Sequence, residues 1–243
     1  MQKISIFIIC KNEEEKIEAC LIQASKLADE IIVVDSGSTD QTIEICKKYT
    51  DKVFHQDWLG FGKQKNIALE KCSYEWVLNL DADEILSDEL INEIQAIDLK
   101  NQAKAYLFAR KLFIGKQKIN FGGFYPDYQL RLFQKSQGRF CHSAVHESVE
   151  LKNDKGEYDK NRIGLFKFKN PILHYAYRNI EELENSFLKY AKLSSKKKNP
   201  FKALLSAAYV FCFKYFIRLG FLDGINGLRL ALINSKYNLQ KYM

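Results

Sequence analysis

The chain has 243 residues, of which 47% are hydrophobic and 13% aromatic, and three prolines interrupt it. This composition excludes long disorder and allows one large α/β domain, or a domain of about 150–200 residues with an extension. The net charge of +7 is unevenly divided: residues 1–159 carry 21 Lys and Arg against 26 Asp and Glu, whereas residues 160–243 carry 16 against 4. The basic last part could face nucleic acid, anionic lipid headgroups or a phosphorylated acceptor.

The six cysteines show neither close pairing nor a C-x-x-C motif, and no Cys/His cluster has the spacing of a zinc site. The N-terminal apolar stretch, residues 4–10, is short and is followed at once by charged residues, unlike a secretory signal. We therefore expect reduced, mostly buried thiols in a cytosolic protein.

Strands and helices are predicted to alternate over the first hundred residues. A capping box of Asn12 and Glu15 predicts the start of the first helix, and Ser38 with Gln41 predicts the start of the second. A third helix is expected around residues 63–71, and Ser87 begins a fourth. Four short segments are expected to be strands, namely 4–9, 31–34, 52–55 and 76–80.

This β-α-β order predicts a mostly parallel sheet with right-handed crossovers. Ligands of such sheets bind outside the carboxyl ends of the strands. The polar clusters 10–13, 35–40 and 81–84 stand at three of those ends, so we expect them to converge.

The pattern changes after residue 104. Strands are predicted at 105–114 and 129–134, joined by a loop of glycines and aromatic residues, and 152–162 reads as a surface loop. From Pro171 onward the chain is predicted to be helical, with a capping box at Asn179 and Glu182 and a further helix start at Asn199-Pro200.

The most informative pattern is Asp81-Ala82-Asp83, which follows the apolar run WVLNL. Alternate carboxylates at a strand end can aim at one small cation, and Mg²⁺ or Mn²⁺ is typically held by one or two carboxylates with water and substrate phosphates. Such an ion neutralises the charge that develops on a departing diphosphate. The alternative is that these acids only cap the next helix.

Two further clusters have candidate binding roles. Asp35 can accept hydrogen bonds from a nucleobase or a ribose, although it also fits a turn with helix capping. Lys63 and Lys65 could neutralise phosphate or contact the base, or simply form a solvated helix face. Residues 11–13 could be a helix start and nothing more.

The ordered set IFIICKNEEEKI, EIIVVDSGSTDQT, GKQKNIAL and EWVLNLDADE resembles the family 2 glycosyltransferases, which share the GT-A fold. The later segments GGFYPDYQLRLF and AVHESV resemble more narrowly the lipopolysaccharide-core β-glucosyltransferases, with a looser likeness at GFLDG. The resemblance implies a GT-A-like α/β fold, with a catalytic domain at 1–175 and a basic, apolar helical extension at 176–243. Residues 1–100 would be its nucleotide-sugar half and 101–175 its acceptor half.

By this resemblance Asp83 binds the metal, with Asp81 beside it, and the cofactor is Mg²⁺ or Mn²⁺. The donor is a UDP-sugar, and the acceptor is a lipid-linked saccharide at the cytoplasmic face of the inner membrane. The nucleotide-sugar site would comprise Lys11, Asn12, Glu13, Asp35, Ser36, Lys65, Asp81 and Ala82.

The family inverts the anomeric centre by direct displacement, which needs a general base but no enzyme nucleophile. The Glu/Asp-Asp pair that many related enzymes use has no matching dipeptide here. Glu147, next to His146, is the first candidate for this base, and Asp127 is the second. Arg131 could pair with the diphosphate or orient a carboxylate, or be the structural partner of Asp127.

The basic tail contains eleven uncharged residues, 203–213, fewer than the roughly 20 that span a bilayer. A helix lying in the interface of an anionic membrane, helped by the lysines 196–198, fits this pattern, and so does a helical layer packed on the domain.

Three functions compete. A hexosyltransferase explains all three polar clusters, with another envelope glycan or a protein as alternative acceptors. A nucleotidyltransferase would show a glycine-rich loop after the first strand, where this chain has CKNEEEK. A basic module that binds membrane or nucleic acid leaves D-x-D unexplained, and the tail lacks a nucleic-acid-binding signature.

Overall fold

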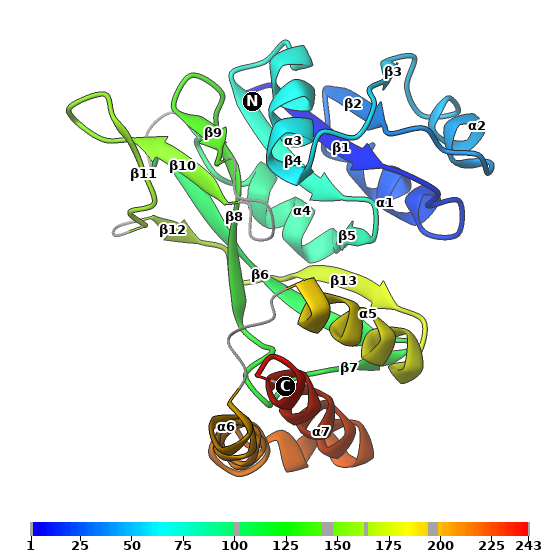
Figure 1. The fold of residues 1–243 in the computed structure, drawn as a ribbon. Coiled ribbons are helices and arrows are strands. Elements are labelled where there is room, and N and C mark those ends of the chain that lie inside the picture. The colour runs from blue at the N-terminus through cyan, green and yellow to red at the C-terminus, as the bar shows by residue number, and fades with distance from the viewer. Residues whose placement is uncertain (1, 100–102, 142–147, 163–164, 194–198, 243) are drawn as a thin grey trace. The chain divides into compact units, whose positions relative to one another are not determined.

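The computed structural model describes residues 2–99, 103–141, 148–162, 165–193 and 199–242 (Figure 1). The chain forms two compact units. The first comprises Met1–Ala109 and Tyr128–Leu173, and the second comprises Arg110–Asp127 and His174–Met243. The second unit thus contains the expected C-terminal extension together with a segment from the middle of the chain, and the catalytic boundary at residue 175 stays a prediction.

Four parallel strands carry the first unit. These are β1 (Ile4–Cys10), β2 (Glu30–Asp35), β3 (Val53–His55) and β4 (Trp76–Asp81), in the order β3-β2-β1-β4. All four coincide with predicted strands to within a residue or so. β1, β2 and β4 are mostly apolar and buried, as fits strands covered on both faces, whereas β3 at the edge of the sheet is partly exposed. The expected α/β class with a mostly parallel, helix-flanked sheet is confirmed.

Alternation along β1 divides the core into two layers. The even-numbered residues from Ile4 to Ile8 pack with α1 (Ile17–Ala24), α2 (Thr42–Cys46) and α4 (Asp88–Gln95). Phe7 and Ile9 pack instead with α3 (Phe61–Lys71) and with strands of a second, small sheet. Five of the six cysteines are buried free thiols, as expected, whereas Cys212 is exposed.

Later strands extend the main sheet beyond β4. β8 (Asp127–Gln134) pairs antiparallel with β4, followed by β6 (Ala105–Ile114), β13 (Ile172–Tyr177) and β5 (Glu84–Leu86), and β12 (Phe166–Lys167) lies parallel beside β6. The small sheet consists of β9 (Gly138–Phe140), β10 (Val149–Lys152) and β11 (Tyr158–Asp159).

Two sequence predictions in this region are wrong. The chain does not turn helical at Pro171, because β13 first adds a strand to the sheet and its alternating pattern was too short to distinguish from a helix start. The segment 152–162 is not wholly a loop, because β11 returns to pair with β10 despite its polar sequence.

The first two predicted capping boxes are also wrong. Asn12 has a positive φ of 55° and lies outside α1, where its Oδ1 accepts the Thr39 N–H at 2.8 Å. Ser38 donates its hydroxyl to Asp35 instead of capping α2. The Ser38 hydroxyl also accepts the Asn12 N–H, so both side chains take part in bonds between the two loops, a tertiary arrangement that competes successfully with local capping. The predicted caps at Ser87 and Asn199 are confirmed, since each accepts a backbone N–H three residues later, at 3.2 and 2.9 Å.

The second unit is mainly helical. It contains the end of β6 paired with β7 (Gln117–Lys118), most of β13, then α5 (Ile180–Leu193) and α6 (Pro200–Cys212). A π-helical turn η1 (Phe213–Ile217) and a 3-10 turn η2 (Gly220–Asp223) lead into α7 (Gly224–Gln240). The expected cap at Asn179 is present, with its Oδ1 accepting the Glu182 N–H at 2.9 Å. The hydrophobic core of the second unit comprises Ile114, Ile119, Leu183, Leu230 and Ile233.

Candidate functional site

Three polar loops meet at the carboxyl edge of the parallel sheet in the first unit. The register pairs Cys10 with Asp35 and Ile9 with Asp81, so the residues that follow β1, β2 and β4 leave the sheet side by side. The nucleotide-sugar and metal residues predicted from the sequence all belong to this unit, namely Lys11, Asn12, Glu13, Asp35, Ser36, Lys65, Asp81, Ala82 and Asp83.

Asp35 organises the loop after β2. Its side chain is 1% exposed, and Oδ2 accepts the N–H groups of Gly37 and Ser38 at 2.8 and 2.9 Å. Oδ1 accepts the Ser38 hydroxyl at 2.5 Å, and the Cys10 thiol lies 3.7 Å away. The carboxylate therefore shapes its own turn, in which Gly37 has a φ of 86° that suits glycine.

The loop after β1 is tied to this turn. The N–H of Asn12 donates to the Ser38 hydroxyl at 2.8 Å, and that of Glu13 donates to Thr42 Oγ1 at the same distance. On the other side, the buried Gln64 donates its amide to the Ser36 hydroxyl at 2.9 Å. The two loops are thus held in one arrangement, with Lys11 exposed at their rim.

Asp81 lies between two buried cations. Its Oδ1 is 2.9 Å from Lys65 Nζ and its Oδ2 is 2.7 Å from Arg131 Nη2, while the two cationic residues are 2% and 5% exposed. Burial by itself would raise the pKa of the Asp81 carboxyl, but Arg131 and Lys65 outweigh it and hold that pKa well below its usual range. Asp81 is therefore a carboxylate whose two oxygens are both engaged by the protein.

Arg131 connects Asp81 to two more buried groups. Its Nη2 is 2.5 Å from Glu84 Oε1, and its Nη1 donates to Asn79 Oδ1 at 2.7 Å. Glu84 in turn accepts the backbone N–H of Asp81 at 3.0 Å, which fixes the turn. Although burial opposes its charge, the two carboxylates raise the pKa of the guanidinium.

Asn79 and Gln64 are site residues that the sequence reasoning missed. Asn79 is a fully buried polar side chain in an otherwise apolar strand, and that interruption of WVLNL was an available signal. Gln64 gave no comparable signal, because its partner Ser36 lies 28 residues away.

Asp83 belongs to the same turn, two residues after Asp81. It is half-buried, whereas its neighbours Ala82 and Glu84 are 6% and 0% exposed. Among the described residues no group of three or more His, Cys, Asp and Glu forms a metal cage. The donors nevertheless fit a hard cation of the Mg²⁺ type, because such an ion takes one or two carboxylates and completes its shell with water and phosphate oxygens.

Of the two candidate general bases, the structure describes Asp127. Asp127 belongs to the second unit, where its Oδ2 accepts from Arg110 Nη2 at 2.6 Å and from Arg110 Nε at 2.9 Å. Arg110, rather than Arg131, is thus the arginine that forms an ion pair with Asp127. Glu147 and His146 lie outside the described residues, so the identity of the base stays a prediction.

Comparison with known proteins gives one family. The model described as Glycosyl transferase family 2 matches residues 5–146, more than half of the chain. A Rickettsia typhi protein named "Uncharacterized glycosyltransferase" is 36% identical, with 93% of this chain and 81% of that protein covered. The lipopolysaccharide core biosynthesis glycosyltransferase LpsC of Rhizobium meliloti is 30% identical, with 91% and 82% covered.

Solved structures of more distant proteins are also similar. Residues 1–349 of TarS from S. aureus match with a TM-score of 0.48 at 19% identity, covering 99% of this chain and 81% of that one. Glucosyl-3-phosphoglycerate synthase from Mycobacterium tuberculosis, in complex with Mg²⁺ and UDP, matches with a TM-score of 0.37 at 24% identity, covering 45% and 44%. On the strength of the family match and the two near full-length relatives, the chain belongs to glycosyl transferase family 2.

Proposed function

We propose that the protein transfers a hexose, most simply glucose, from a UDP-sugar to a lipid-linked saccharide during assembly of the lipopolysaccharide or lipooligosaccharide core. The observation that carries the proposal is the arrangement of the Asp35 loop and the Asp81–Asp83 turn on adjacent parallel strands of a family 2 chain. The likeness to LpsC over nine-tenths of this chain supports the acceptor class.

In this proposal the loops after β1 and β2 receive the nucleotide, with Lys11, Asn12, Glu13, Asp35 and Ser36 lining its pocket. Asp35 is already bonded to its own turn, so it presents the turn's remaining polar groups as a fixed surface. Preorganised donors of this kind cost little reorganisation when substrate binds.

Asp83 is proposed to hold the divalent cation, with Asp81 beside it as a second-choice ligand because Lys65 and Arg131 occupy its oxygens. Mg²⁺ or Mn²⁺ bound there would neutralise the charge that develops on the leaving diphosphate. Arg131 and Lys65 pair with Asp81 and so hold the turn that contains Asp83.

The transfer itself is proposed to be a single displacement with inversion. The acceptor hydroxyl oxygen forms the new bond to the anomeric carbon while the bond from that carbon to the diphosphate oxygen breaks. A carboxylate, Glu147 or failing that Asp127, takes the proton of the acceptor hydroxyl. The acceptor places the enzyme at the cytoplasmic face of the inner membrane, with an anionic membrane surface as partner.

Other acceptors remain alternatives within the same chemistry, namely another envelope glycan or a protein. A nucleotidyltransferase is disfavoured because the loop after β1 has no glycine to admit a triphosphate closely. The proposal includes no nucleic-acid partner.

The metal assignment is tested by Asp83→Asn. We expect the variant to lose divalent-metal-dependent turnover of UDP-glucose by about 100-fold or more, since the stabilisation of the leaving group is removed. A matched control is Asp88→Asn, an exposed aspartate in the first turn of α4 whose loss should leave turnover unchanged. Wild-type turnover in Asp83→Asn would refute the assignment.

The general base is tested separately. Glu147→Gln should still bind the donor, measured by thermal shift with UDP-glucose and Mn²⁺, yet lose transfer to the acceptor. If Glu147→Gln transfers normally and Asp127→Asn does not, the role passes to Asp127.

A further inference from the structure

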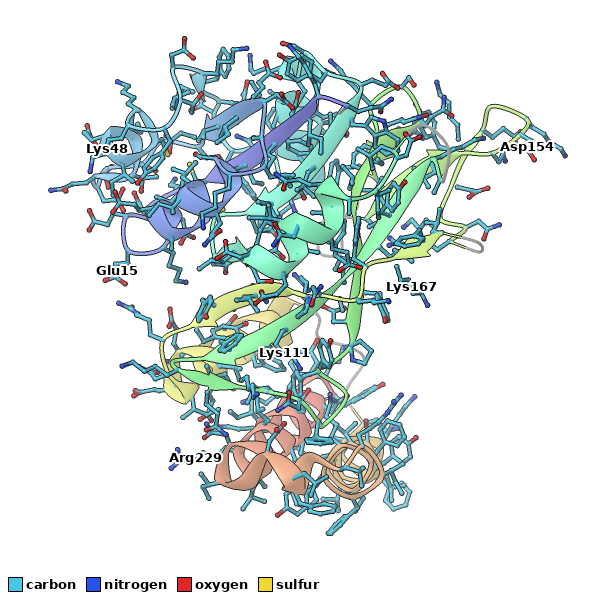
Figure 2. All side chains as sticks on the ribbon, turned by 180° about the vertical axis from the view of Figure 1, so that it is seen from behind. Glu15, Lys48, Lys111, Asp154, Lys167 and Arg229 are labelled. Atoms are coloured by element: carbon cyan, nitrogen blue, oxygen red, sulfur yellow. The ribbon has the colours of Figure 1, made fainter. Side chains whose placement is uncertain are left out.

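The C-terminal part of the second unit exposes an unusual number of large apolar side chains. Their exposed fractions run from 44% to 74%, and they follow one another along α6, η1, η2 and the start of α7. Figure 2 shows ring side chains standing out around this end of the unit. We call this set the C-terminal apolar surface: Phe201, Leu204, Leu205, Tyr209, Phe216, Ile217, Leu219, Phe221, Leu222 and Ile225.

The charges around this surface have one sign. Between residues 185 and 243 the sequence contains eleven Lys and Arg and one acid, Asp223. Asp223 is 7% exposed and faces inward, because its carboxylate accepts the N–H groups of Asn120 and Phe121 at 3.0 and 2.8 Å. Lys202, Arg218 and Arg229 are exposed, and Figure 2 shows Arg229 projecting away from α7. An apolar surface bordered by cations complements an anionic lipid surface.

By length and composition Pro200–Ile217 could cross a membrane, since it has a mean hydropathy of 1.3 over 18 residues. Only 11% of this segment is buried in the structure, so it is not a core helix either. Its attachments decide between spanning and lying flat. One face of α6 is docked on α7, with Ala203 and Ala207 buried and Ser235 Oγ donating to the Ala207 carbonyl at 2.8 Å.

The far end of the segment is also held by polar groups. Lys214 Nζ donates to the Gly122 carbonyl at 3.2 Å and lies 4.4 Å from the Phe124 ring centroid. The Gly122 N–H donates to the Arg218 carbonyl at 2.9 Å. Crossing the bilayer would carry these groups and the charged α7 into hydrocarbon, or would break every one of these contacts.

We propose that the C-terminal apolar surface inserts into one leaflet of an anionic bilayer, so that α6 lies in the interface plane and does not span the membrane. The apolar side chains would enter the headgroup and acyl boundary, to the depth of about 5–10 Å usual for such helices. Lys202, Arg218 and Arg229 would remain at headgroup level. The proposal deepens the proposed function by naming the residues that bring the enzyme to a lipid-linked acceptor.

Cys212 provides a probe already in place. It is the exposed cysteine on α6 while the other five are buried, so a thiol-reactive, environment-sensitive fluorophore should label it selectively in the native protein. We expect its emission to shift to the blue with vesicles of equal parts phosphatidylglycerol and phosphatidylcholine, and to stay unchanged with phosphatidylcholine alone. Lipids that carry a quencher near the headgroup should quench the fluorophore more than lipids that carry the quencher at the bilayer centre. No shift with anionic vesicles, or strongest quenching at the centre, overturns the proposal.

Substitutions test the surface without the label. Ile217→Glu should lower partitioning into the same vesicles at least about tenfold. The variant loses an apolar side chain that would insert into the membrane, and its new carboxylate is repelled by the anionic headgroups. Ile22→Glu is the matched control: Ile22 is 46% exposed on α1 in the first unit, and this variant should bind like wild type. Arg218→Gln and Arg229→Gln should each lower binding about fivefold. Equal binding by Ile217→Glu and Ile22→Glu would sink the idea.

Two other outcomes are separable. If light scattering shows a wild-type dimer that Ile217→Glu makes monomeric, while vesicle binding is unaffected, the surface is a contact between copies and the proposal is wrong. Vesicle binding needs neither donor nor acceptor, so its failure would leave the glycosyltransferase proposal untouched. Conversely, Asp83→Asn should bind vesicles like wild type even with transfer abolished.

Discussion

The guanidinium of Arg131 pairs with several buried groups of the candidate site. Arg131 is bonded to Asn79, Asp81 and Glu84 at once, and Glu84 has no exposed surface. Taking charges out of water is costly, so each buried carboxylate depends on the cation opposite it. The planar fork of arginine reaches several acceptors with fixed geometry, which a lysine ammonium cannot reproduce.

Arg131→Lys should therefore be damaging although the charge is kept. We expect the free energy of unfolding to fall by about 2 kcal/mol, because at least one buried acceptor loses its donor. Sugar transfer should fall as well, since the Asp81–Asp83 turn loses its anchor. Urea denaturation and a transfer assay measure the two effects. Arg139→Lys, at an arginine whose side chain is 51% exposed, should change neither by much; a tolerant Arg131→Lys would contradict the anchoring role.

Glu30 predicts how stability responds to acid. Its buried carboxylate pairs closely with Lys52 and accepts hydrogen bonds from Ser5 and Ser73. Burial alone would raise the pKa of this carboxyl, but these partners outweigh burial and lower the pKa to about 2. The folded pKa lies below the unfolded value of about 4.3, so the stabilisation is present above pH of about 4.3 and is lost as the pH falls towards 2.

Glu30→Gln should remove this contribution, about 3 kcal/mol at neutral pH by the size of the shift. The difference in unfolding free energy between wild type and variant should shrink steadily between pH of about 4.3 and about 2. Denaturant titrations at a series of pH values would show it. A difference that did not depend on pH would mean that packing, rather than charge, is what the substitution removes.

At the level of elements, the C-terminal turns pack too closely for side chains. A Cβ added at Gly227 would lie 1.7 Å from the Gly220 carbonyl oxygen, and one at Gly220 would lie 2.7 Å from that of Lys214. The two glycines let α7 and η1 each contact η2 backbone to backbone, and Asp223 then ties η2 to the loop at Asn120. The C-terminal apolar surface is thus carried on a rigid corner.

Gly227→Ala should destabilise the second unit. Helix propensity alone would favour alanine by about 1 kcal/mol, but overpacking at such a contact costs typically 1–3 kcal/mol, and here backbone must move. We expect a net loss of about 1–2 kcal/mol, read as a lower melting temperature. Arg229→Ala, two residues later on the exposed side of α7, should melt like wild type. A Gly227→Ala variant that is more stable than wild type would show that the backbones of α7 and η2 can move apart at little cost.

Elements formed by local pattern were predictable, and contacts across the sheet were not. The strands β1 to β4 and the caps at Ser87 and Asn199 follow from apolar runs and capping chemistry within a few residues. The capping box at Asn12 failed because its side chain found a partner 27 residues away. The convergence of the polar loops could be predicted, because it follows from the order of the parallel strands. The pairing of Arg131 with Asp81 could not, because it required knowing that β8 lies against β4.

Over the whole molecule, charge is divided between an acidic first part and a basic last part. The basic part coincides with most of the second unit, while the polar loops after β1, β2 and β4 lie in the first. Attraction of a basic surface to anionic lipid is screened by salt, with a Debye length of about 10 Å at 0.1 M and about 3 Å at 1 M. Recognition of a UDP-sugar in the proposed donor site would be screened much less.

Salt should consequently separate the two activities. Transfer to a lipid-linked acceptor in anionic vesicles should fall several-fold between low and high salt, because less enzyme is at the surface. Hydrolysis of UDP-glucose without acceptor should change little over the same range. The two rates can be measured on one preparation, with neutral vesicles as the control. Equal salt sensitivity of both rates would place the effect at the donor site.

The position of Arg131 in the chain also has a consequence for synthesis. Asp81 and Glu84 leave the ribosome about 50 residues before the guanidinium that neutralises them. At 5–20 residues per second, a nascent chain carries these carboxylates without it for roughly 3 to 10 s. During that interval the exposed edge of β4 has no β8 beside it. Residues 1–100 alone therefore leave Asp81 and Glu84 without the guanidinium that pairs with them in the folded chain.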